Sequence, residues 1–232
     1  MTMRLLIGYD GSESADAALV DLRRAGLPRE VEALIISVSD GLVNPSSSIA
    51  DIAGSAATSR RVTSAIALAR EQAAQALEEA KQFAAKAGKR VRSSFPDWEV
   101  QTAGLTGSPS TELINKADEW KADLVVVGSQ GRSALGRFIL GSVSKKVVTD
   151  SHHSVRVTRG TVKQNGDLPQ KIMIGVDGSP EAEHAVRAVG RRVWPEGTQV
   201  RIIAVDDGTS PTRIADIVLA ADELIRGCNE GL

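Results

Sequence analysis

A segment near the beginning of the chain recurs near its end, and this repetition constrains the fold more than any other feature of the sequence. Residues 171–179, KIMIGVDGS, align without a gap with residues 4–12, RLLIGYDGS, at a constant offset of 167 residues. A second apolar run follows in both places, at 35–38 and at 202–205. Each copy therefore predicts a strand, a helix and a second strand, the order of a right-handed βαβ unit. The helix positions that keep the offset are Ala15, Ala18, Leu19 and Leu22 in the first copy and Ala182, Ala185, Val186 and Val189 in the second.

The stretch between the two copies completes the first of them. Continuous apolar runs at 5–9, 33–38 and 124–127 predict strands covered on both faces, as in parallel sheets. Trp98 opens a third predicted strand, and Val155 and Val157, separated by Arg156, mark a fifth that lies at an edge. The sequence therefore predicts a doubly wound α/β domain with a mainly parallel, five-stranded sheet.

Helices are predicted between these strands by apolar residues at helical spacing. One is alanine-rich, begins after a loop at 44–59 and closes at Gly88. Two more are predicted from Ser110 to Trp120 and from about Ser142, where the serine is expected to cap the helix.

The second copy contains one further helical pattern after residue 205 and nothing that corresponds to residue 98 onward. We therefore expect a complete domain at 1–160, a linker at 161–170 and an incomplete second domain, a partial βαβα repeat, at 171–232. The second copy keeps Asp177, but it has no glycine-rich loop and is not expected to bind a phosphate group by itself.

Composition narrows the class of protein. A formal net charge of -1 argues against a partner that is bound through its phosphate backbone, so nucleic acid is not expected. The single cysteine, Cys228, cannot form an internal disulfide and fits a reducing compartment. The first residues, MTMRLLIGYDGSE, lack the apolar core of a signal peptide, and no uncharged apolar run approaches the roughly 20 residues of a membrane helix. A soluble, cytoplasmic protein is the expectation.

The residues most informative about function follow the predicted strand at 124–127. Gly128 and Gly131 are separated by two residues, and nine residues later come Gly141 and Ser142. Glycines after a parallel strand let backbone N–H groups approach an anion, and a helix N-terminus adds favourable partial charge. Arg132 and Arg137 lie within the loop and could neutralise charge. From the residues alone this supports anion binding, with turn formation by the glycines as the alternative.

Two related motifs are excluded. Gly136 and Gly141 have the glycine spacing of a Walker P-loop, but Ser142-Val143 stand where that loop has lysine followed by serine or threonine. The first strand is not followed by G-x-G-x-x-G, which disfavours a dinucleotide site of the Rossmann type.

The complete pattern G-x2-G-x9-G-S resembles the motif of ATP-binding members of the universal stress protein family. The strand ending in Asp10-Gly11-Ser12, the strand at 123–128 and the turn Gly107-Ser108-Pro109 are also similar to that family. The resemblance covers residues 3 to about 158, and the fragment 171–226 resembles the start of the same domain. It implies a Rossmann-like fold of the adenine nucleotide alpha hydrolase type.

The resemblance also implies ATP as the ligand, with Mg²⁺ as a possible companion. Asp10 would lie beside the phosphates or the metal ion, although by its position it serves equally well as a turn residue before Gly11. Val38 would meet adenine through its backbone, and the remaining implied contacts with ribose and phosphates are Gly128, Gly131, Arg132, Gly141, Ser142 and Val143.

The implied function is that of a stress-response regulator that binds ATP and acts through nucleotide-dependent association, with a homodimer as the expected oligomer. No positioned general base or nucleophile is visible, so any ATP hydrolysis is expected to be slow and an enzymatic role stays uncertain. Two alternatives remain open. One is an interaction module that no longer uses nucleotide, and the other is a slow ATPase or adenylating enzyme.

Overall fold

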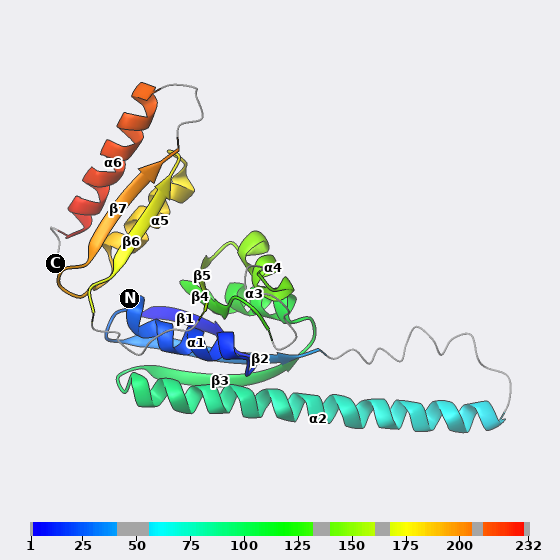
Figure 1. Cartoon of the computed structure of the whole chain (residues 1–232). Helices are drawn as coiled ribbons and strands as arrows, with labels where there is room; N and C mark the ends of the chain where they lie inside the picture. Colours follow the sequence, from blue (N-terminus) through cyan, green and yellow to red (C-terminus); the bar gives the residue numbers. More distant parts are fainter. Residues whose placement is uncertain (1, 41–55, 132–139, 161–167, 206–210, 230–232) are drawn as a thin grey trace. The chain divides into compact units, whose positions relative to one another are not determined.

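The structure, a computed structural model, describes residues 2–40, 56–131, 140–160, 168–205 and 211–229 (Figure 1). Contacts divide the chain into two compact units. The first comprises Met1–Asp21 and Arg29–Lys163, and the second comprises Leu22–Pro28 and Gln164–Leu232.

The first unit is built on a five-stranded sheet in which every neighbouring pair of strands is parallel. The strand order is β3-β2-β1-β4-β5, so the doubly wound α/β fold predicted from the sequence is confirmed. The central strands have continuous apolar runs because helices cover both faces, and Leu5, Leu6 and Ile7 are completely buried. The strands are β1 (Met3–Gly8), β2 (Val31–Ser39), β3 (Glu99–Thr106), β4 (Leu124–Gly128) and β5 (Ser154–Thr158).

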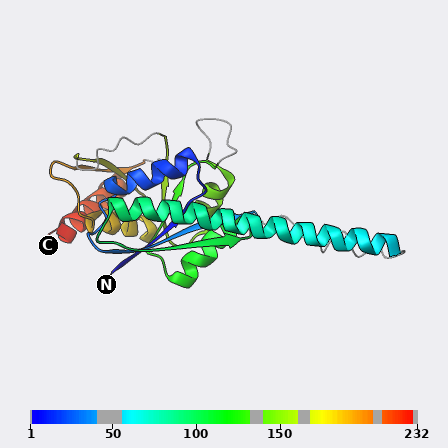
Figure 2. The same ribbon diagram turned by 90° about the horizontal axis from the view of Figure 1, so that it is seen from below.

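Two pairs of helices enclose this sheet (Figures 1 and 2). α3 and α4 contact each other and pack on a layer of buried strand residues that includes Leu6, Ile36 and Val125. Right-handed crossovers place α1 and α2 on the opposite face, where Phe83 of α2 lies against Gly11 at the end of β1. The helices are α1 (Glu13–Asp21), α2 (Ala56–Ser94), α3 (Pro109–Trp120) and α4 (Ser142–Asp150), with a short 3-10 turn, η1 (Leu22–Arg24), after α1.

α2 differs from the sequence prediction at both ends. It begins at Ala56, within the stretch expected to be a loop, and it continues through Gly88 to Ser94. Gly88 is therefore not a helix terminator: a Cβ there would lie 2.5 Å from Cγ2 of Thr102, so the glycine lets the helix approach β3. The N-terminal part of α2 extends well beyond the sheet (Figures 1 and 2).

The second unit contains a two-stranded parallel sheet and two long helices. Its core consists of buried apolar residues, among them Ile174, Val186 and Ile225. The elements are β6 (Lys171–Val176), α5 (Pro180–Gly190), β7 (Gln199–Ala204) and α6 (Pro211–Asn229).

The turn after β6 has the same local geometry as the turn after β1. In the second unit, Asp177 Oδ1 accepts a hydrogen bond from Ser179 N at 2.9 Å, and Gly178 has a φ of +82°. In the first, Asp10 Oδ1 accepts from Ser12 N at 3.0 Å, and Gly11 has a φ of +80°. A left-handed φ at the middle residue is the reason that both turns use glycine.

Candidate functional site

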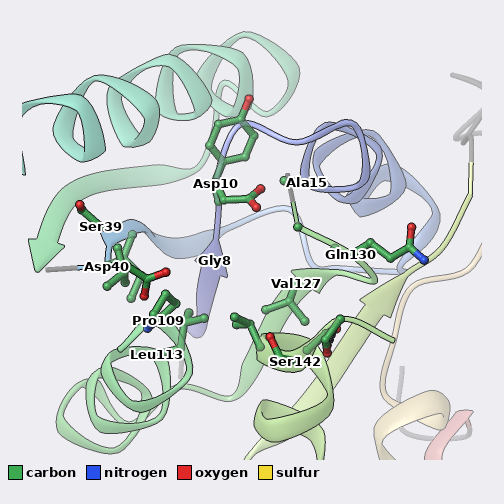
Figure 3. Close-up of a pocket in the computed structure, with 18 residues that line it drawn as sticks. Gly8, Asp10, Ala15, Ser39, Asp40, Pro109, Leu113, Val127, Gln130 and Ser142 are labelled. Carbon is green, nitrogen blue, oxygen red and sulfur yellow. Dashed lines mark hydrogen bonds between the residues drawn. The ribbon is translucent and has the colours of Figure 1, made fainter. Parts of the chain in front are cut away.

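A cavity of about 630 Å³ opens at the carboxyl ends of the central strands of the first unit. The strand order reverses between β1 and β4, and such a switch point leaves a crevice in doubly wound sheets. Eighteen of the described residues line the cavity, from the ends of β1, β2 and β4, the beginnings of α1 and α3, and both sides of the loop that leads into α4 (Figure 3).

The structure brings most of the predicted site residues together at this cavity. Seven of them line it: Asp10, Val38, Gly128, Gly131, Gly141, Ser142 and Val143. The predicted loop cations Arg132 and Arg137 lie outside the described residues.

The two carboxylate oxygens of Asp10 have different surroundings. One carboxylate oxygen, Oδ1, completes the turn by accepting the Ser12 N–H at 3.0 Å. The other oxygen faces the glycine loop, because a Cβ on Gly131 would lie 3.1 Å from Asp10 Oδ2. A carboxylate with one oxygen held by the backbone and one directed toward the cavity supplies the oxygen donor that hard cations prefer.

The base of the glycine loop is closed by hydrogen bonds to the Ser129 carbonyl. Gly141 N donates to it at 2.8 Å, and the hydroxyl of Ser144 donates at 2.9 Å. α4 begins directly afterwards with Gly141 as its N-cap, so the prediction that Ser142 caps this helix is wrong. No side chain among the described residues caps the helix, and the N–H groups of its first turn have no partner within the helix. These N–H groups and the helix dipole favour an anion at this end of the cavity.

Glycine is not required by the backbone at Gly131 or Gly141. Neither has a φ in the left-handed region, and Gly141, with φ of -63°, adopts a conformation open to other residues. A Cβ on Gly141 would be no closer than 3.4 Å to its nearest neighbour, Cα of Gln130, which is ordinary van der Waals contact. The backbone angle therefore does not require glycine at either position, although a Cβ on Gly131 would crowd Asp10 Oδ2.

Sequence reasoning missed several residues of the cavity wall. Ser39 and Asp40 follow Val38 at the end of β2, and Pro109 and Leu113 come from α3. Asp40 could have been found, because it lies two residues after Val38, where the apolar run of the second strand ends. In Figure 3 the carboxylates of Asp10 and Asp40 both point into the space between the strand ends. They are the charged side chains among the described lining residues.

A buried tyrosine anchors the strand end that carries Asp10. The Tyr9 hydroxyl donates to Asp16 Oδ1 of α1 at 2.6 Å, and Arg90 of α2 pairs with the same oxygen. Burial of the phenol, assisted by the hydrogen bond to Asp16, raises the pKa of Tyr9 to about 12. This cluster ties the end of β1 to both helices on that face of the sheet.

These features define a doubly wound α/β domain with a ligand-sized cavity at its switch point. A sequence model of the universal stress protein family matches residues 1–159, and the chain belongs to this family. Among the described residues, the helices contain no stretch long and apolar enough to cross a membrane.

Individual relatives agree with this assignment. The chain is 35% identical over 78 residues to universal stress protein MJ0531 of Methanocaldococcus jannaschii, covering 33% of this chain and 46% of that protein. It is 28% identical over 192 residues to a universal stress protein of Mycolicibacterium smegmatis, covering 81% of this chain and 60% of the relative. The chain thus spans about half the length of these two relatives.

A solved structure shares the fold. A universal stress protein from Archaeoglobus fulgidus superposes with a TM-score of 0.59 at 18% identity, and the match covers 95% of this chain and 73% of the other.

Proposed function

We propose that this chain is an ATP-binding regulator of the stress response, acting in the cytoplasm through nucleotide-dependent association. The observation that carries the proposal is the cavity at the strand ends, which Gly128, Gly131 and Gly141 line beside the uncapped first turn of α4. Glycines at this place would let a ligand approach the main chain of the loop closely.

The cavity offers a different environment to each part of ATP. The phosphates fit the N-terminus of α4, where the N–H groups of Ser142 and Val143 lack helical partners. Adenine fits the end of β2, where the Val38 backbone supplies hydrogen-bonding groups and Leu113 an apolar wall. Ribose then lies between these ends, near Gly128.

Mg²⁺ would accompany the phosphates at Asp10. Carboxylate oxygens and phosphate oxygens are the ligands this ion prefers, and Asp10 Oδ2 faces the cavity beside Gly131. Asp40 supplies a second carboxylate in the same space. Bound Mg²⁺ would offset the repulsion between these acids and the triphosphate.

We also propose the organisation through which nucleotide acts. The chain would consist of a complete domain at 1–160, a linker at 161–170 and an incomplete tandem copy at 171–232, associating as a homodimer. The shared turn geometry at Asp10 and Asp177 supports the tandem copy. In the second copy the turn is not followed by a glycine loop, so one nucleotide per chain is expected.

Calorimetric titration of the purified chain with ATP, with and without Mg²⁺, tests the proposal. We expect saturable binding near one site per chain and a loss of at least about tenfold in affinity for Gly141→Val, whose side chain would crowd the loop backbone at 129–131. Gly175→Ala is the matched control, because a Cβ there meets nothing within 4 Å. Sizing of the protein with and without ATP then reports association.

Two outcomes would redirect the proposal. Absence of binding by nucleotide-free wild-type protein would favour the interaction module that does not use nucleotide. Rapid conversion of ATP to ADP would favour an enzyme instead, with Asp10 or Asp40 as the acid-base group to examine.

A further inference from the structure

The glycine loop is held in place by a helix that is distant in sequence. The Gln130 carbonyl accepts hydrogen bonds from two hydroxyls near the start of α1, those of Ser12 at 3.3 Å and of Ser14. The bond to Ser14 is reciprocal, because Gln130 N donates back to Ser14 Oγ at 3.2 Å. One serine side chain therefore satisfies both backbone groups of the residue that directly precedes Gly131.

The two serines are not equivalent. Ser12 Oγ also accepts the Ala15 N–H at 3.2 Å, so it caps α1 and its loss would weaken that helix. Ser14 is the second residue of α1, where a hydroxyl is not needed to cap the helix. The bonds recorded for its hydroxyl go to Gln130 and, at 3.4 Å, to Ser12. Removal of the Ser14 hydroxyl therefore breaks the hydrogen bonds to the loop but leaves the cap of α1 intact.

The first glycine of the motif belongs to the same arrangement. A Cβ on Gly128 would lie 2.5 Å from Ser14 Oγ, 2.6 Å from Ser14 C and 2.8 Å from Ala15 N. Two of these contacts are with backbone atoms, which cannot move aside without displacing α1. Glycine at 128 is thus required for α1 to come close enough for Ser14 to reach Gln130.

The other side of the loop is fixed independently. Gly141 N and the Ser144 hydroxyl both donate to the Ser129 carbonyl, from the α4 side. Ser129 and Gln130 are therefore held from opposite directions, by α4 and by α1. The position of Gly131, which lines the cavity, follows from these two attachments.

We propose that Ser14 is a positioning residue for the phosphate-binding loop and that Gly128 is glycine because Ser14 must lie against it. The inference rests on the proposed nucleotide function of this cavity. Ser14 itself does not touch the nucleotide. It positions the Gln130–Gly131 backbone, so its loss weakens the binding of the phosphate groups but not the binding of the nucleoside.

The test compares ATP and adenosine as ligands of wild-type protein, Ser14→Ala and Ser14→Thr by calorimetry, beside urea unfolding of the same three proteins. We expect Ser14→Ala to weaken Mg·ATP binding by about 3- to 10-fold, the range for loss of a net hydrogen bond. Adenosine affinity should stay within about twofold, because adenosine has no phosphate to hold. Ser14→Thr keeps the hydroxyl and should restore ATP binding.

If Ser14 had only a structural role, its loss would lower the affinities for ATP and adenosine and the urea unfolding midpoint together. Equal binding of ATP by wild type and Ser14→Ala, or an equal loss of adenosine affinity, overturns the inference and leaves the proposed function standing. If wild-type protein binds no adenine nucleotide, the proposed function fails and the inference falls with it.

Discussion

Tyr9 is the single tyrosine of the chain, and it is 3% exposed beneath the strand end that carries Asp10. Its pKa is raised from 10.0 to about 12, by burial and then by the hydrogen bond to Asp16. The unfolded chain therefore releases this proton at a lower pH than the folded chain does. Stability contributed by the protonated phenol is complete below pH 10 and is lost as the pH rises from 10 toward 12.

The tyrosinate absorbance of the folded protein reports this titration directly, because the chain has one tyrosine. We expect a midpoint near 12 in the wild type and a lower one in Asp16→Ala. Tyr9 should lower the free energy of unfolding by about 2–3 kcal/mol as the pH rises from 10 to 12, and this decrease should be missing in Tyr9→Phe. A wild-type midpoint near 10 would contradict the role given to burial.

Arg156 explains an irregularity in the last strand of the sheet. Its guanidinium pairs with Asp21 Oδ2 at 2.8 Å, with side chains 25% and 13% exposed, and the buried Thr158 hydroxyl donates to the same oxygen at 3.0 Å. The charged residue that interrupts Val155 and Val157 thus anchors the edge strand to α1. Since Asp21 is largely buried, removal of Arg156 leaves the Asp21 carboxylate without its ion-pair partner and lowers the free energy of unfolding.

We expect Arg156→Ala to destabilise the fold by about 1–3 kcal/mol in urea unfolding. Arg29→Ala is the matched control, because Arg29 pairs with Asp97 at 2.9 Å with side chains 85% and 48% exposed. That variant should leave the unfolding midpoint unchanged, since exposed pairs are screened by solvent. Equal effects from the two variants would contradict the importance of burial.

At the residue scale, sequence reasoning located cavity residues that belong to a local pattern. Gly131 and Gly141 were found because their spacing is visible along the chain, and Asp10 because the resemblance to the family implied it. The partners of Arg156 and Ser14 were not predicted, because Asp21 and Gln130 lie 135 and 116 residues away in sequence. Ser142 was assigned as a helix cap because serine suits that role, but Gly141 occupies it and leaves the first-turn N–H groups open.

At the scale of elements, the contact between α2 and β3 depends on a glycine in the middle of a strand. A Cβ on Gly104 would lie 2.6 Å from Lys81 N and 2.9 Å from Lys81 Cα, both backbone atoms of α2. Gly104→Ala should therefore push the helix away from the strand and destabilise the fold by about 1–3 kcal/mol.

Gly175→Ala in β6 is the natural comparison, because it makes the same change in a strand where nothing lies within 4 Å. It should be neutral or slightly stabilising, since alanine reduces the entropy of the unfolded chain. Thermal unfolding of both variants distinguishes the two cases. A neutral Gly104→Ala would mean that α2 does not pack as closely as described.

The same contact shows why the helix boundary was mispredicted. Gly88 was read as a C-cap because glycine commonly ends helices. Its absent side chain instead makes room for Thr102 of β3, a partner that no local pattern reveals. The strands were easier to predict, because burial on both faces leaves continuous apolar runs that single-sequence reasoning recognises.

For the whole molecule, the sequence predicted the parallel five-stranded sheet and the second, shorter set of elements, because both follow from apolar periodicity and turn residues. Association could not be derived in the same way, because an interface depends on surfaces that assemble only after folding. The two Asp-Gly-Ser turns, at Asp10 and at Asp177, offer the clearest experiment at this scale. They have the same geometry, but a cavity with a glycine loop is described only beside the first.

Asn at either position keeps an oxygen that can accept the Ser N–H and complete the turn, so the substitution removes the charge and replaces the other oxygen with an NH2 group while the turn is kept. We expect Asp10→Asn to weaken Mg·ATP binding by about tenfold, because a carboxylate ligand of the ion is lost. Without Mg²⁺ the same variant should bind ATP as well as wild type or better, because the carboxylate repels the triphosphate. Asp177→Asn should match wild type under both conditions. Calorimetry with and without Mg²⁺ measures all four cases, and a comparable loss in Asp177→Asn would mean that the second turn takes part in the site.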